Sequence, residues 1–201
     1  MNTTPRRPGF PAFVAVIAAA LALASAVTAS AAPQRYVIEP LHTFVTFEVL
    51  HFGTSTVRAR FDRKDGHIVL DREARTGEAM ITIDTASVSS GVPDFDKHLK
   101  SKDFFDAANT PEATFTGTKF AFDGDRITGV DGTLTLLGRT NPVSLKALRF
   151  NCYDNPILEA RVCGGDFETT IRRSQWGMNW GIDMGIPDEV RLAIQIEAVR
   201  Q

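Results

Sequence analysis

The chain has 201 residues, of which 43% are hydrophobic and 23% charged, and its formal net charge is −2. This composition is that of an ordinary globular protein, and it excludes disordered, collagen-like and disulfide-dense chains. The slight acidic excess, with cations scattered along the chain, also argues against a nucleic-acid partner, because such binding depends on neutralising phosphates.

The first residues predict a secretory signal peptide. Arg6 and Arg7 precede an uncharged, apolar stretch from Ala12 to Ala24 that is too short to span a bilayer comfortably, and Ala29-Ser30-Ala31 supplies a small-residue cleavage pattern. We expect residues 1–31 to be the signal peptide. Residues 32–201 then form one exported domain, long enough to bury a sizeable core.

After this segment, apolar and polar residues alternate with a period of two, which predicts strands. The predicted strands are 43–51, 57–62, 67–70, 78–85, 113–122, 126–137, 143–150, 167–171 and 189–199. Turns are expected at Lys64-Asp65-Gly66, at Asp123-Gly124-Asp125 and over 137–142.

One segment breaks the alternation. Pro93 and Asp94 suit the start of a helix, and Phe95 and Leu99 lie four residues apart, so a short helix is expected over 93–100. Residues 101–106 continue it as another helical turn or as a lid-like loop.

Strands without intervening helices exclude a parallel α/β sheet. A sandwich and a closed barrel both fit this pattern, and the barrel is favoured because nearly every strand has one apolar and one polar face. The expected fold is all-β: a single antiparallel eight-stranded barrel with a short helical insertion. A barrel of this size encloses room for a small or elongated ligand.

Cys152 and Cys163 flank Asn155-Pro156 and are expected to form an intramolecular disulfide, since export leads to an oxidising compartment. The alternative is two unpaired thiols. A metal site is not expected, because this stretch contains no histidine and the rest of the chain shows no closely spaced set of metal ligands.

The sequence offers no case for catalysis. The chain has four histidines, in no metal-binding pattern, and no Gly-x-Ser-x-Gly motif. His51 lies on an apolar strand face, which is typical of a hydrogen-bonded core histidine; the alternative is contact with a ligand head group. Trp176 to Trp180 is interpreted as an irregular connection. The phenylalanines after residue 31 either fill a solid core or line a lumen that holds a ligand by burial.

Several segments together resemble the YceI-like family of exported lipid-binding proteins. They are His42–Gly53, Asp96–Asp106, Pro111–Phe115, Gly132–Leu145, Ile171–Met178 and Val190–Glu197, and the similarity runs from Tyr36 to Val199. The resemblance implies a lipocalin-like barrel in the bacterial periplasm, with no catalytic cofactor. Its tunnel would hold a polyisoprenoid chain, such as the tail of an isoprenoid quinone or a prenyl phosphate. The two cysteines resemble a pair found in one branch of the family.

The same resemblance nominates residues that would contact the lipid, in three groups. The expected wall residues are Val45, Phe47, Val49, Ile81, Ile83, Val143, Leu145, Phe167 and Ile171; the expected lid residues are Phe95, Leu99, Phe104 and Phe105; the expected head-group contacts are His51, His98 and Arg173. For each of them the alternative is plain core packing.

The predicted function is that of a periplasmic binding or carrier protein, not an enzyme, for an isoprenoid lipid. One alternative is a ligand-free stress or interaction module with a filled core, and another is a small-molecule enzyme that uses His51 or His98. A membrane redox or lipid-transfer partner and a homodimer are left open, and no nucleic-acid partner is expected.

Overall fold

The computed structural model describes Met1, Thr3 and residues 32–201. The predicted signal peptide, residues 1–31, lies outside the described residues except for Met1 and Thr3. The chain from Ala31 onward is a compact unit of its own, and the fold below is the fold of that unit.

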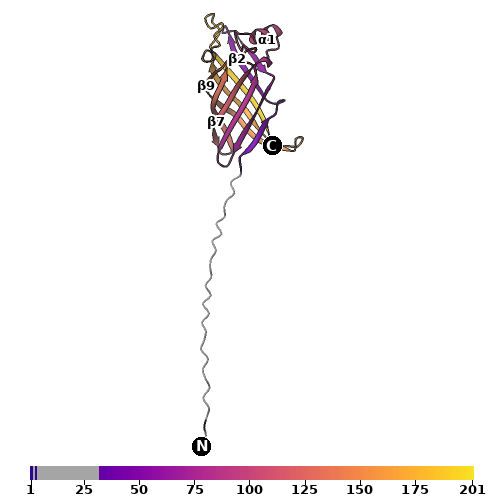
Figure 1. The fold of residues 1–201 in the computed structure, drawn as a ribbon, viewed down its shortest axis with the longest axis vertical. Helices are drawn as coiled ribbons and strands as arrows, with labels where there is room; N and C mark the ends of the chain where they lie inside the picture. The colour runs from indigo at the N-terminus through magenta and orange to yellow at the C-terminus, as the bar shows by residue number, and fades with distance from the viewer. Residues whose placement is uncertain (2, 4–31) are drawn as a thin grey trace. The chain divides into compact units, whose positions relative to one another are not determined.

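Residues 32–201 form a closed antiparallel β-barrel whose ring has eight strands (Figure 1), which confirms the predicted fold. The ring closes because β1 pairs with both β4 and β11. In spatial order the ring strands are β1 (Gln34–Ile38), β4 (Lys64–Asp71), β5 (Thr76–Asp84), β7 (Glu112–Asp123), β8 (Arg126–Leu136), β9 (Arg139–Asn155), β10 (Ala160–Arg172) and β11 (Glu189–Arg200).

At one end of the barrel, three further strands extend the wall. β2 (Phe44–His51) pairs with the first half of β11, and β3 (Ser55–Phe61) pairs with β2 and with the short β6 (Val88–Ser89). The 3₁₀ turn η1 (Thr85–Ser87) leads into β6, and helix α1 (Pro93–Leu99) follows. Figure 1 shows α1 at this end and the C-terminus at the other. In the described part of the chain, no helix has the length and apolar character needed to cross a bilayer.

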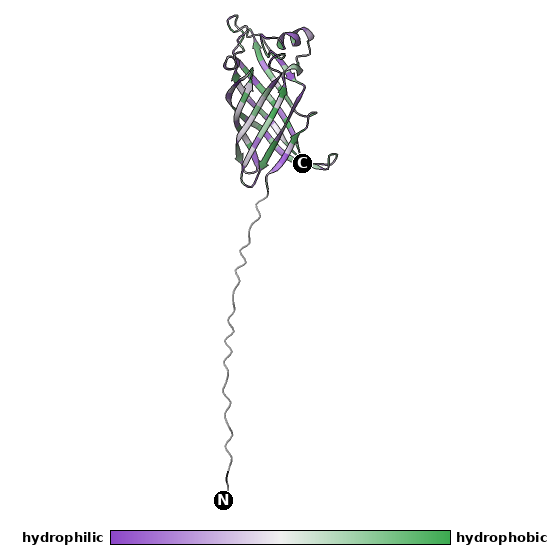
Figure 2. Cartoon of the chain, viewed as in Figure 1, coloured by the Kyte–Doolittle hydropathy of each residue, from purple (hydrophilic) through white to green (hydrophobic). Residues whose placement is uncertain are grey.

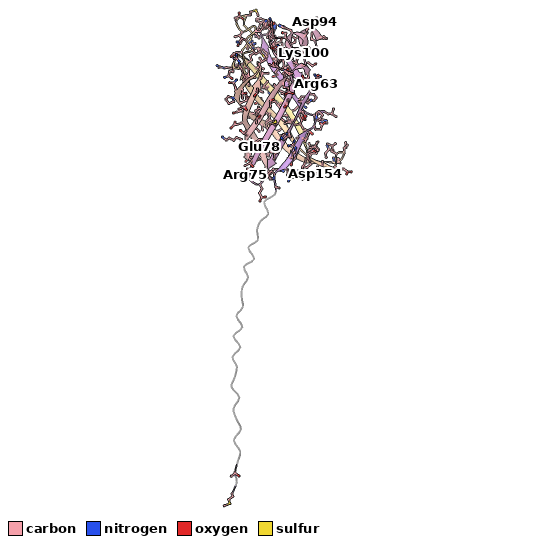
Figure 3. All side chains as sticks on the ribbon, viewed as in Figure 1. Arg63, Arg75, Glu78, Asp94, Lys100 and Asp154 are labelled. Carbon is pink, nitrogen blue, oxygen red and sulfur yellow. A yellow bond between two sulfur atoms is a disulfide. The ribbon has the colours of Figure 1, made fainter. Side chains whose placement is uncertain are left out.

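The two faces of each strand differ, as the alternation predicted. In β2, Val45 and Phe47 are buried, whereas Glu48 lies on the outer face in ion pairs with Arg58 and Arg191. Figure 2 shows hydrophobic and hydrophilic residues interleaved along the strands, and Figure 3 shows charged side chains such as Arg63 and Glu78 on the outside. The barrel therefore turns its apolar faces inward.

Two local predictions were wrong, and both concern turns. Lys64, Asp65 and Gly66 lie in β4, and the chain only bends at Asp62 and Arg63, because β3 and β4 run in the same direction and do not pair with each other. A Cβ on Gly66 would lie 2.2 Å from the carbonyl oxygen of Met80 on the neighbouring strand, so glycine here permits a close approach of two strands. The turn expected over 137–142 is also shorter, since β9 already begins at residue 139. Strands β1 and β6 were not predicted.

Cys152 and Cys163 form the expected disulfide. The two residues face each other directly in the β9–β10 pair, with their Cα atoms 4.1 Å apart. Beyond them, the side-chain oxygen of Asn155 accepts hydrogen bonds from the backbone N–H groups of Ile157 and Leu158, at 2.9 and 3.1 Å. The disulfide and this turn hold the hairpin that extends from the end of the barrel opposite α1 (Figure 1).

Candidate ligand-binding site

Two apolar cavities lie end to end inside the barrel. The upper cavity, at the α1 end, has a volume of about 430 Å³, and the lower cavity has a volume of about 130 Å³. Val45, Ile83, Leu134 and Leu192 line both cavities and form a waist between them. The two cavities therefore adjoin each other at the waist.

The lower cavity is enclosed by the ring strands. Tyr36, Leu70, Ile127 and Phe167 are among its buried lining residues. Thr43, a polar residue on this lining, has its hydrogen-bonding capacity satisfied internally: its hydroxyl donates to the carbonyl oxygen of Glu197 and accepts from the N–H of the same residue, both at 3.1 Å. Such surroundings suit hydrocarbon and disfavour a charged group, which would lose its hydration there.

The structure places every residue that the sequence nominated for ligand contact on one cavity or the other. Ile81, Val143, Leu145 and Phe167 line the lower cavity, and Val45 and Ile83 line both. The rest line the upper cavity: Phe47, Val49, His51, Phe95, His98, Leu99, Phe104, Phe105, Ile171 and Arg173. The predicted walls and lid therefore surround one interior space, and their contact with a ligand stays a prediction.

Helix α1 and the turns that follow it form the lid of the upper cavity. Leu99 and Phe105 are buried, with 2% and 7% of their surface exposed. The Phe105 ring packs against the rings of Phe47 and Phe61, with centroids 5.7 and 5.1 Å apart. Residues 101–109 form turns and not a continued helix, so the lid-like loop is the correct one of the two expected forms.

A single carboxylate fixes the start of the lid. One oxygen of Asp96 accepts hydrogen bonds from the hydroxyl and from the backbone N–H of Ser90, both at 2.6 Å. The Ser90 hydroxyl, with the Ser90 amide and the cation of Lys100 contributing less, holds the pKa of the Asp96 carboxyl below its ordinary value. The ionised form of Asp96 is therefore the one that ties α1 to the strand before it.

Arg173 organises the loop over 177–188. The residue is 3% exposed, and its guanidinium donates to the carbonyl oxygens of Pro187 (3.0 Å), Met178 (3.1 Å), Trp180 (2.7 Å) and Ile186 (3.4 Å). Burial lowers the pKa of this guanidinium, and the nearby carboxylate of Asp188 acts in the opposite direction. Arg173 also lines the upper cavity, so its proposed contact with a head group would be additional to this structural role.

The two nominated histidines lie near the opening of the upper cavity. His51 is exposed at the end of β2, so the expectation of a hydrogen-bonded core histidine is wrong. The Nε2 atom of His98 lies 3.2 Å from a carboxylate oxygen of Asp103. The His98 ring also meets Phe104 and Trp180 edge-on, with centroids 4.9 and 4.7 Å apart. His98 thus connects the lid to the loop over 177–188.

The sequence reasoning missed one side of the upper cavity. Trp180, Met184 and Ile186 of the loop between η2 (Arg173–Trp176) and β11 line it, as does Phe52 of the β2–β3 turn. The aromatic and glycine-rich stretch was read correctly as an irregular connection, but its composition gave no direction for the side chains. In the lower cavity the missed residues include Tyr36, Ile68, Phe115, Phe120 and Phe150.

The fold and the site together define a class: an antiparallel barrel, lipocalin-like in architecture, with a divided apolar interior under a helical lid. Among the described residues, no group of histidine, cysteine, aspartate and glutamate is arranged to hold a metal ion. The YceI-like domain model matches residues 36–198. The chain belongs to the YceI-like family.

Individual relatives agree with this assignment. The chain is 36% identical to Protein YceI of Escherichia coli O157:H7 over 179 residues, covering 88% of this chain and 92% of the relative. BcnA of Burkholderia cenocepacia has a similar structure, with a TM-score of 0.65 at 23% identity over 80% of this chain and 98% of BcnA. A polyisoprenoid binding domain from Saccharophagus degradans, implicated in plant cell wall breakdown, matches with a TM-score of 0.60 at 18% identity, covering 83% and 98%. At these identities, the structural matches establish the fold.

Proposed function

We propose that this protein is a periplasmic binding or carrier protein for a long polyisoprenoid lipid, either an isoprenoid quinone or a prenyl phosphate. The observation that carries the proposal is the divided interior, with an upper cavity of about 430 Å³ that continues at the waist into a lower cavity lined by apolar side chains. A filled core, which the ligand-free alternative requires, fits this interior poorly.

Burial supplies the binding energy in this proposal. Each methylene group that moves from water into an apolar lining contributes about 0.8 kcal/mol, so a chain of several isoprene units binds without specific hydrogen bonds. The lining then needs the right width and few polar groups, as the two cavities provide.

The choice of an isoprenoid over another apolar chain is supported by a relative. The Saccharophagus degradans domain that shares this fold is described as a polyisoprenoid binding domain. A branched chain also suits a lining of phenylalanine, valine, leucine and isoleucine, because methyl branches fill gaps that a straight chain leaves.

The proposed orientation follows from where polar groups lie. The lower cavity has no suitable place for a charged or strongly polar head, whereas His51, His98 and Arg173 line the upper one. The tail would therefore occupy the lower cavity and the head group would lie under the lid. Release would require α1 to move, and a lipid-transfer or redox partner at the membrane would receive the lipid. The proposed role is binding, not catalysis.

Native mass spectrometry of protein purified directly from the periplasm tests the proposal. We expect a near-stoichiometric mass increment, and solvent extraction followed by chromatography would identify its head group. A mass equal to that of the mature chain, together with no uptake of an added isoprenoid quinone or prenyl phosphate, would contradict the proposal. The measured mass also checks the expected cleavage after residue 31.

A further inference from the structure

At the α1 end of the barrel, three apolar side chains line the upper cavity and are also exposed to solvent. Phe52, Trp180 and Met184 line the upper cavity, yet 53%, 36% and 54% of their surfaces face solvent. We call these three residues the mouth rim. These three side chains thus belong both to the lining of the cavity and to the outer surface of the protein.

The backbone holds the mouth rim in place. Phe52 has a φ of 49° and Gly53 a φ of 70°, so the β2–β3 turn places a bulky residue in a conformation that non-glycine residues rarely adopt. The loop that carries Trp180 and Met184 is tied down by Arg173, which donates to the carbonyl oxygen of Trp180 at 2.7 Å. A Cβ on Gly185 would lie 3.7 Å from the Phe52 ring, so the two loops lie close to each other.

We propose that the mouth rim docks on the surface of a lipid bilayer, so that an apolar ligand passes between bilayer and cavity without crossing water. This inference rests on the proposed function, because it takes the ligand to be a membrane lipid. The reason for choosing a bilayer is that the exposed rim and the cavity lining are one surface. A docked bilayer extends the apolar path outward, whereas a protein covering the rim would block it.

The residue types agree with shallow insertion. Tryptophan and phenylalanine combine a large apolar surface with a ring that is stable at the level of lipid head groups. Charges of both signs lie at this end, including Asp94 and Lys100 (Figure 3) and Asp183 next to Met184. Because no single sign dominates, we expect docking that is weak, driven by apolar contact, and insensitive to salt and to anionic lipid.

Vesicle flotation of the full-length mature protein, stripped of ligand, tests docking directly. The vesicles are phosphatidylcholine without any isoprenoid, and half of them carry bromine on the acyl chains. The test variant is Phe52→Ser/Met184→Ser. The matched control is Met80→Ser/Leu148→Ser, because Met80 and Leu148 are 48% and 50% exposed but line neither cavity.

We expect the wild-type protein and the control variant to float with the vesicles, and the test variant to float roughly tenfold less. Bromine should quench tryptophan fluorescence in the floated fraction of the wild type. That signal reports Trp180, because Trp176 is only 1% exposed. Equal melting temperatures of the variants would show that folding is preserved, and the single change Met184→Ser serves if the double variant is unstable.

Several results would overturn the inference. The first two are a wild-type protein that does not float and an equal loss of flotation in both double variants. The others are flotation that requires anionic lipid and low salt, and a loss of flotation caused by Ile157→Ser at the opposite end of the barrel. The result is separate from that for the proposed function, since the vesicles carry no isoprenoid. Flotation of a protein that carries no co-purifying isoprenoid would contradict the proposed function but not bilayer docking. A co-purifying isoprenoid without flotation would contradict bilayer docking alone.

Discussion

The lower and upper halves of the barrel interior are built in different ways. The lower cavity is enclosed by ring strands that are each hydrogen-bonded on both sides, so its shape depends on the backbone ladder. The upper cavity has strands on one side, and on the other it has α1 and the loop over 177–188, which a few side-chain hydrogen bonds hold in place. This difference implies that the lower half sets how much apolar chain fits, whereas the upper half controls access.

The largest expected effect comes from the side chain on which the upper half most depends. Replacing Arg173 by methionine leaves several backbone carbonyl groups of the loop over 177–188 without donors, and each buried one costs about 1–3 kcal/mol. Because water reaches part of this loop, we expect the free energy of unfolding to fall by about 3 kcal/mol, measured by urea denaturation.

A matched arginine on the outer wall provides the control. Arg191 pairs with Glu48 and Glu168 at 2.8 and 2.9 Å, and 42% of its side chain is exposed. Arg191→Met should lower the free energy of unfolding much less than Arg173→Met, because exposed ion pairs contribute little. Equal losses for the two arginine variants would contradict the special role assigned to Arg173.

The second prediction concerns the lower half, where the disulfide links β9 to β10 in addition to their backbone hydrogen bonds. Changing Cys152 and Cys163 together to serine should lower stability by about 2–3 kcal/mol, the range for a short closed loop. Thermal denaturation with and without reductant measures the effect. The wild type should lose stability in reductant and the serine variant should not; a wild type indifferent to reductant would refute the prediction.

The third prediction tests access through the lid. Phe104→Asp puts a charge into the apolar lining of the upper cavity, and we expect about tenfold less bound isoprenoid per protein after identical purification, measured by native mass spectrometry. Phe44→Asp is the control, because Phe44 lies on the outer face under Arg60 and Lys64 and lines neither cavity. Equal occupancy in the wild type and the Phe104 variant would show that the lid does not contribute to ligand binding.

The smallest expected effect is on the attachment of the lid at low pH. The folded-state pKa of Asp96 is lowered, so its stabilising contribution is present above the ordinary value of 3.8 and is lost as the pH falls through the lowered value. The emission of Trp180, which contacts His98 of the lid, should therefore change on acidification in the wild type. In Asp96→Asn this acid transition should be absent, and its persistence would show that another group controls the lid.

Much of the fold could be predicted from the sequence because a barrel strand with one face in water shows a regular alternation. That is why β2, β5 and β11 were found with nearly correct limits. β1 was missed since it is short and pairs with strands distant in sequence. Gly66 was misread as a turn residue. Glycine is required there because Met80 of the neighbouring strand comes too close for a side chain, and the residues next to Gly66 in the sequence do not reveal this.

The candidate site was also predictable only where its residues lie on regular strands. Inward-facing positions such as Val45 and Phe167 follow from alternation along single strands, and the structure places both on a cavity. Met184 and the carbonyl partners of Arg173 lie in an irregular loop with no period to read. Their positions depend on contacts between segments far apart in the chain, which a local pattern does not encode.

The closure of the ring has one more consequence. Residues 36–38 of β1 pair with residues 198–200 of β11, and the N–H of Gln201 donates to the carbonyl oxygen of Arg35 at 2.9 Å. A short linker could therefore join Gln201 to residue 34, with new ends opened at Gly124 in the β7–β8 turn. Such a circular permutant would keep every strand neighbour of the ring while changing their order in the chain.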